Sequence, residues 1–253
     1  MRVLIIGSGG REHALSWKVA QSGKAEKIYC APGNGGTAQE GENIPLKDSD
    51  IAGLVSFAKE NAVDFVIPGP ELPLTLGVVD AMTQAGIRCF GPSRWCAQLE
   101  GSKAFAKDIM QKAASPPPPA ACSPNWKPPK PLWKKGAPIV IKADGLAAGK
   151  GVVVAQTKEE ALEALGQIMG GMFGAAGSRV VIEEFLVGEE VSLLAFCDGK
   201  TALPLPSAQD HKAVFDGDAG PNTGGMGAYS PAPIVPDADL ERWPNITIRP
   251  ILA

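Results

Sequence analysis

The sequence predicts an α/β protein that begins with a parallel β-sheet domain and continues as an α+β part. Short apolar runs in the first hundred residues each lead into a glycine or proline; they are Val3–Ile6, Lys27–Cys30, Asp64–Ile67 and Arg88–Phe90. The stretches between them space apolar residues three or four apart, as amphipathic helices do. Strands that are apolar throughout and alternate with helices indicate a parallel sheet covered on both faces.

The first element, RVLIIGSGGREHA, is a strand that ends in a glycine turn and opens a helix, as in many dinucleotide-binding proteins. That fingerprint requires a third glycine where this chain has Glu12, and an acidic residue after the second strand, where it has Ala31-Pro32-Gly33. A nicotinamide dehydrogenase is therefore disfavoured. Backbone N–H groups at the helix N-terminus still favour an anion such as a phosphate, and a turn needed only for packing stays the alternative.

Length and composition narrow the function classes. A chain of 253 residues predicts about two domains. The net charge of −3 offers no basic field for general nucleic-acid binding. The five cysteines include no Cys-x-x-Cys pair, which argues against a disulfide framework or a zinc site. We see neither a signal peptide nor a membrane span, and so expect a cytoplasmic protein.

The second half opens with a helix that Ser102 is expected to cap. Residues 115–138 then contain nine prolines, which predict polyproline II or irregular chain; a linker and a Pro-x-x-P ligand for a partner domain both stay open. A strand, a glycine-rich loop over 145–151 and a second strand follow. The spacing is wrong for a Walker P-loop, but a loop with Lys142 before it and Lys150 within it can fold over a polyphosphate.

After a helix expected from about Lys158, the next strand ends in Glu183 and Glu184. One of these carboxylates should face the apolar side and need a partner, such as a ligand amine or a nearby lysine; the alternative is an edge strand that exposes both. Beyond Ser207 the chain is mostly glycine, proline and polar residues, which predicts a long functional loop. His211 in this loop is by itself more typical of a turn cap than of a catalyst.

Taken together, these segments resemble one family. The motifs, in order, are GSGGREHA, APGNGGT, PGPE, GPS, LEGSKAFAK, IKADGLAAGKGVVVA, VIEEFLVGEE, AQDHK and GPNTGGMGAYSPAP. They follow one another as in the phosphoribosylamine–glycine ligases, or glycinamide ribonucleotide synthetases, of the ATP-grasp superfamily. The resemblance implies an N-terminal Rossmann-like domain over 1–101 that precedes a truncated ATP-grasp domain over 102–253, with a lid subdomain over about 115–186.

The resemblance also implies a reaction and a set of ligand contacts. ATP would activate glycine as glycyl phosphate, and the amine of 5-phosphoribosylamine would attack it, in de novo purine synthesis. The family pattern implies ATP contacts at Lys103, Lys142, Gly145, Gly149, Lys150, Gly151, Glu183, Glu184, Phe185, Leu186 and Glu190. It implies substrate contacts at Gly9, Gly10, Asn34, Gly36, Pro70, Glu71, Asp210, Lys212, Asn222, Thr223, Gly224, Gly225 and Met226. The family's Mg²⁺ ligands, a glutamate and an asparagine, are expected in a C-terminal part that this sequence lacks, so no metal ligand and no catalytic residue is assigned.

Three patches depart from the family pattern: the proline segment, SRWCAQ and LERWPNITIRPILA. They hold four of the five tryptophans, which leads us to interpret them as local frameshifts or gene damage. Ala213 also stands where many relatives have arginine. The alternative to an active ligase is therefore a noncatalytic remnant that still binds nucleotide. We expect a monomer or weak oligomer with no nucleic-acid or membrane partner.

Overall fold

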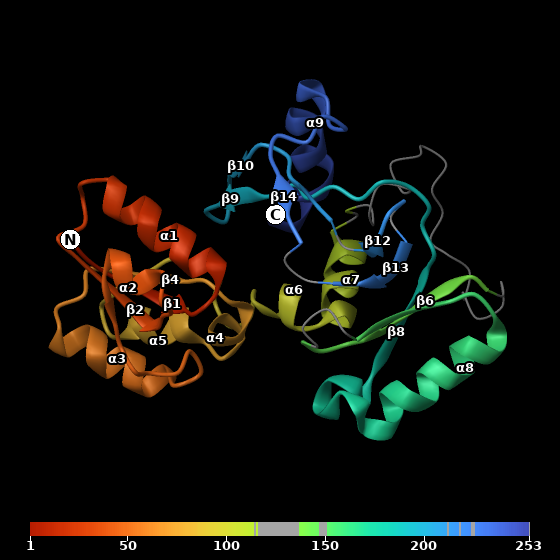
Figure 1. The fold of residues 1–253 in the computed structure, drawn as a ribbon, viewed down its shortest axis with the longest axis horizontal. Helices are drawn as coiled ribbons and strands as arrows, with labels where there is room; N and C mark the ends of the chain where they lie inside the picture. Colours follow the sequence, from red (N-terminus) through yellow and green to blue (C-terminus); the bar gives the residue numbers. More distant parts are fainter. Residues whose placement is uncertain are drawn as a thin grey trace. The chain divides into compact units, whose positions relative to one another are not determined.

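The computed structural model of the chain describes residues 1–113, 115, 137–146, 151–211, 213–217, 219–223 and 226–252. It divides into two compact units, Met1–Gly101 and Ser102–Ala253, which we call unit 1 and unit 2 and describe separately. Figure 1 shows the elements of each unit, coloured along the sequence. Most of the proline segment, and Gly149 and Lys150 of the glycine loop, lie outside the described residues.

Unit 1 is built on a parallel sheet with strand order β3-β2-β1-β4-β5. The strands are β1 (Arg2–Gly7), β2 (Lys27–Pro32), β3 (Glu42–Asn43), β4 (Phe65–Pro68) and β5 (Arg88–Cys89). The helices are α1 (Gly10–Gln21), α2 (Thr37–Glu40), α3 (Ile51–Glu60), α4 (Glu71–Thr75), α5 (Val78–Gln84) and α6 (Gln98–Gly101). The predicted parallel sheet and its four apolar strands are confirmed, whereas β3 is too short to have produced a pattern.

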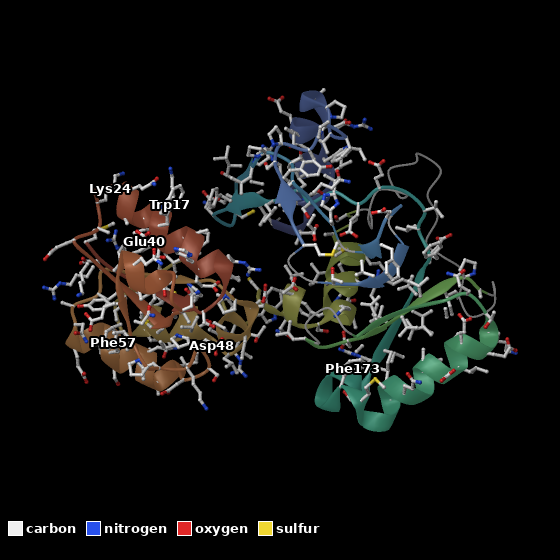
Figure 2. All side chains as sticks on the ribbon, viewed as in Figure 1. Trp17, Lys24, Glu40, Asp48, Phe57 and Phe173 are labelled. Atoms are coloured by element: carbon white, nitrogen blue, oxygen red, sulfur yellow. The ribbon has the colours of Figure 1, made fainter. Side chains whose placement is uncertain are left out.

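Helices cover both faces of this sheet (Figure 1). Helix α1 packs on one face, against Val3 and Ile5, and helices α3 and α5 pack on the other, against Leu4 and Ile6. The side chains of these four residues of β1 are all buried. Because successive side chains of a strand point to opposite faces, a strand covered on both sides is apolar without alternation. Figure 2 shows Phe57 of α3, which packs against the second of these cores.

Unit 2 contains an antiparallel sheet with strand order β7-β6-β8. Its strands are β6 (Ile139–Ala143), β7 (Val152–Ala155) and β8 (Val180–Glu184), and the neighbouring helices are α7 (Lys103–Lys112) and α8 (Lys158–Gln167). A π-helical turn (Ile168–Met172) and a 3-10 helix (Gly174–Ser178) follow α8. The core side of the sheet packs on α8, with Phe173 at its margin (Figure 2). The predicted strand–loop–strand unit and the helix from Lys158 are confirmed.

The rest of unit 2 is made of short paired strands and two terminal helices. The pairs are β9 (Ala195–Cys197) with β10 (Ala202–Pro204), β11 (Gln209–Asp210) with β14 (Ala228–Tyr229), and β12 (Ala213–Phe215) with β13 (Ala219–Asn222). The helices are α9 (Asp237–Thr247) and α10 (Arg249–Leu252). The expectation of a long loop beyond Ser207 is wrong in part, because this segment pairs with itself. Strands of two to four residues show no periodicity that a sequence pattern could reveal.

Candidate functional site

Three turns meet along the carboxyl edge of the unit 1 sheet, and Asn34 joins the first two. Its side-chain Nδ2 donates to the carbonyl oxygens of Ser8 (2.8 Å) and Gly9 (3.0 Å) in the turn after β1. Its Oδ1 accepts the backbone N–H groups of Gly36 (2.7 Å) and Thr37 (3.0 Å) in the turn after β2. One amide side chain therefore uses both its donors and its acceptor to hold two turns together.

Arg11 joins the first turn to the third. Its Nη1 donates to the carbonyl oxygen of Gly69 (2.8 Å) and pairs with Oε1 of Glu71 (3.1 Å), at the start of α4. The structure thus brings the six unit 1 residues that the family pattern indicates into turns on one edge of the sheet; they are Gly9, Gly10, Asn34, Gly36, Pro70 and Glu71. This edge is where parallel α/β sheets bind their ligands.

A buried carboxylate lies beneath these turns. Glu12 is only 4% exposed, and its Oε2 accepts the N–H of Gly9 at 2.6 Å. A Cβ added to Gly69 would lie 1.9 Å from Glu12 Oε1, and one added to Gly7 would lie 2.6 Å from Glu12 Cδ. In the sequence, Glu12 stands out only as a departure from the dinucleotide fingerprint. In the structure, this side chain occupies the space that the two glycines leave open.

Arg11 and His13 are residues of this edge that the sequence analysis misses. The His13 ring lies against the second turn, where a Cβ added to Gly36 would come within 2.3 Å of its Nδ1. Both residues lie near the N-terminus of α1, where the N–H of His13 already donates to the carbonyl oxygen of Gly9 at 3.2 Å. Their position directly after the glycine turn was the available signal.

In unit 2, Glu183 is held between two lysines. Its Oε2 lies 2.6 Å from Lys142 Nζ and its Oε1 lies 3.0 Å from Lys107 Nζ. Lys142 and Glu183 are diagonal neighbours on adjacent strands, on the sheet face opposite α8, because Val140 pairs with Glu183. Burial by itself would raise the pKa of Glu183, but hydrogen bonds from the two lysines outweigh it and hold that pKa below its ordinary value. A nearby lysine is one of the partners expected for a glutamate of this strand, but that glutamate is expected on the apolar side, whereas Glu183 lies on the face opposite the α8 core.

A second carboxylate, Asp144, lies where β6 ends and the glycine loop begins. Its Oδ1 accepts the N–H of Ala104 (2.7 Å) and the hydroxyl of Ser102 (3.0 Å), and its Oδ2 accepts Arg179 Nε (2.6 Å). Burial would raise the pKa of Asp144, yet these hydrogen bonds lower it. Beside it, Lys103 Nζ donates to the carbonyl oxygen of Gly145 at 3.2 Å. Neither Asp144 nor Arg179 is among the residues predicted from the sequence.

The short strand pairs of unit 2 gather another set of predicted residues. Asp210 of β11 pairs with Ala228 of β14, and Ala213 of β12 pairs with Asn222 of β13. The N–H of His211 donates to the carbonyl oxygen of Gly227 at 3.1 Å, directly beside the β11–β14 pair. Lys212, Gly224 and Gly225 lie outside the described residues, as does the side chain of Asn222.

The remaining predicted ATP contacts flank these clusters. Gly151 accepts the N–H of Ala143 at 2.8 Å at the far end of the glycine loop. Phe185, directly after β8, is half-buried. The other three predicted residues are exposed at the end of β8 and beyond it; they are Glu184, Leu186 and Glu190. The structure therefore joins Lys103 to Gly145, and Lys142 to Glu183.

Within the described part of the chain, no group of three His, Cys, Asp or Glu side chains is arranged to hold a metal ion. None of the helices in the described ranges combines the length and the apolar content needed to span a membrane.

Comparisons with known proteins assign both units to one description. Residues 1–100 match the model "Phosphoribosylglycinamide synthetase, N domain", and residues 101–253 match "Phosphoribosylglycinamide synthetase, ATP-grasp (A) domain". Proteins named phosphoribosylamine–glycine ligase are similar: that of Vibrio vulnificus is 59% identical over 93% of this chain and 56% of its own length. That of Brucella melitensis is 55% identical over the whole of this chain and 59% of its own length.

A solved structure agrees with these matches. The crystal structure of phosphoribosylamine–glycine ligase from Thermotoga maritima is 33% identical and superposes with a TM-score of 0.76. The match covers all of this chain and 60% of that one. The chain thus spans between 56% and 60% of the length of these relatives.

Proposed function

Because this chain belongs to the phosphoribosylglycinamide synthetase family, we propose that it takes part in the ATP-dependent joining of glycine to 5-phosphoribosylamine in purine biosynthesis. The observation that carries this proposal is that both units match domains of one family, in the order that the family has them. ATP, glycine and phosphoribosylamine are the proposed small-molecule partners. A cytoplasmic location and a monomeric or weakly oligomeric state stay predictions.

The proposed reaction has two steps. A glycine carboxylate oxygen attacks the γ-phosphorus of ATP, so that a glycyl phosphate forms and ADP leaves. The amine nitrogen of phosphoribosylamine then attacks the acyl carbon, loses a proton, and displaces inorganic phosphate. The protein would contribute chiefly by positioning the reactants and by neutralising phosphate charge.

We place the nucleotide in unit 2. Lys103 and Lys142 would contact phosphate oxygens, together with the glycine loop that starts at Gly145. Since Lys107 also pairs with Glu183, Lys142 can turn toward a phosphate while that carboxylate keeps one cationic partner. Glu183 to Leu186 would border the adenine, and Glu190 the ribose.

We place phosphoribosylamine on the carboxyl edge of the unit 1 sheet. The first turn of α1 offers N–H groups for the 5-phosphate, and Asn34 and Arg11 support the neighbouring turns. In unit 2, we propose Asp210, Lys212 and the Asn222–Met226 segment as further substrate contacts. Magnesium is expected only because the family uses it. The described residues do not supply a fitting set of ligands, so no step involves it.

The test is ADP formation by the purified chain, measured with ATP and with glycine and phosphoribosylamine each present or omitted. We expect turnover only when both are present, and we expect Lys142→Met to abolish it. Lys112→Met, which removes an exposed cation paired with Asp108 on α7, is the matched control and should retain turnover.

Two other outcomes would change the conclusion. If ATP raises the melting temperature but no ADP forms, the chain binds nucleotide without turnover, as the noncatalytic alternative requires. If ATP neither stabilises the chain nor is consumed, the proposal is refuted for this chain.

A further inference from the structure

Asp144 connects three segments of unit 2 that are distant in the sequence. Its carboxylate accepts hydrogen bonds from the hydroxyl of Ser102 and the N–H of Ala104, at the N-terminus of α7. It also accepts Nε of Arg179, directly before β8, while its own backbone follows β6. The backbone N–H of Asp144 donates to the carbonyl oxygen of Arg179 at 3.0 Å, so these two residues are joined through their side chains and also through their backbones.

We call the contacts of Asp144 with Ser102, Ala104 and Arg179 the junction; Lys103 is held beside it at two points. The backbone N–H of Lys103 donates to the carbonyl oxygen of Asp144 at 3.1 Å. The ammonium of Lys103 donates to the carbonyl oxygen of Gly145, the next residue, at 3.2 Å. The position of this cation relative to the end of β6 thus depends on where Asp144 fixes the start of α7.

The carboxylate is suited to such a role because it is buried and fully partnered. Asp144 is 7% exposed, and its bonds to Ala104 and Arg179 are short, as charge-assisted bonds are. A neutral amide at this position keeps one acceptor oxygen only, and its NH₂ group would face a donor. The side chain of Arg179 is itself 63% exposed, so replacing it removes one partner of Asp144 without leaving a cavity in the core.

We propose that Asp144 is a positioning residue for the nucleotide site: by joining the start of α7 to the end of β6 and to Arg179, it sets where the Lys103 ammonium meets a nucleotide phosphate. This inference rests on the proposed binding of ATP in unit 2. In this arrangement Asp144 does not touch the nucleotide, and it affects ATP binding only by positioning Lys103.

The experiment measures the dissociation constant of ATP for the full chain by isothermal titration calorimetry, in a cycle of Asp144→Asn, Lys103→Met and the double variant. We expect Asp144→Asn to weaken binding by about ten-fold, because a small displacement of a binding group has large effects. We also expect the two losses to be non-additive, since displacing a lysine matters little once its ammonium is gone. Asp108→Asn removes a carboxylate within α7 that pairs with Lys112 and does not contact Asp144, and should change binding by less than about two-fold.

If Asp144→Asn does not fold, Arg179→Gln replaces it in the same cycle, with the same direction expected. Equal ATP affinity in wild type and variant, or losses that simply add, would overturn the inference and leave the proposed function standing. Failure of the wild-type chain to bind ATP would overturn the proposed nucleotide site and this inference with it.

Discussion

Replacing Gly69 by alanine tests whether the buried Glu12 carboxylate organises the carboxyl edge of unit 1. The added Cβ would lie 1.9 Å from Glu12 Oε1, so one of the two groups must move. Forcing a methyl group into filled space costs about 1–3 kcal/mol. If Glu12 turns away instead, its hydrogen bond with the N–H of Gly9 is lost, at a cost of about 1.5–3 kcal/mol for a charged acceptor. We expect the free energy of unfolding of unit 1 to fall by about 2–3 kcal/mol.

Hydrogen exchange of the β1 and β4 amides, followed by mass spectrometry across a urea series, measures this free energy for unit 1 alone. Gly10→Ala is the matched control in the same turn, because a Cβ there meets no atom within 4 Å and its expected effect is within about 0.5 kcal/mol. Adding Glu12→Ala should remove most of the cost of Gly69→Ala. The reasoning is refuted if Gly69→Ala costs no more than Gly10→Ala, or costs the same with and without Glu12.

Three further predictions follow from the contacts. Asn34→Asp removes the amide donors that bind two carbonyl groups of the first turn and sets a carboxylate against them, so urea denaturation should show a loss of about 1–3 kcal/mol. The pKa of Glu183 is lowered on folding, so its ion pairs stabilise the chain above the unfolded pKa, and this contribution is lost as the pH falls through the folded pKa. In melting curves from about pH 6 to pH 3, the melting temperature of Glu183→Gln should therefore fall less with acid than that of wild type. A thiol reagent at about pH 8 should modify the exposed Cys96 and Cys197 before Cys89, whose pKa burial raises to about 12, and peptide mass mapping gives the order.

The fold of unit 1 could be predicted because its signal is local. In β1, an uninterrupted apolar run from Val3 to Ile6 indicates a strand buried on both faces, and the glycine turn after it marks the carboxyl edge. The need of Glu183 for a partner could also be predicted, because a carboxylate in an otherwise apolar strand is costly unless paired. The identity of both partners could not, since Lys107 reaches it from a helix that precedes the proline segment.

The junction at Asp144 illustrates what a sequence pattern leaves out. Its partners Ser102 and Arg179 lie 42 and 35 residues away, in opposite directions, and no local spacing relates them. Glu12 was visible in the sequence, but its burial depends on the room that Gly69 leaves, 57 positions further along. Such contacts are created by tertiary packing, and only the structure gives them.

The two buried carboxylates explain why the two units would bind phosphate by different means. In unit 2, Ser102 and Asp144 already accept the N–H groups of Phe105 and Ala104, so the N-terminus of α7 has few donors left for an anion. In the proposed nucleotide site, phosphate charge would then be met chiefly by the ammonium groups of lysines, beside the glycine loop that starts at Gly145. In unit 1, Glu12 takes the N–H of Gly9, which precedes α1, so the N–H groups of Gly10 and Arg11 stay available. Since backbone donors carry partial charges and lysines carry full ones, salt should weaken nucleotide binding more than sugar-phosphate binding.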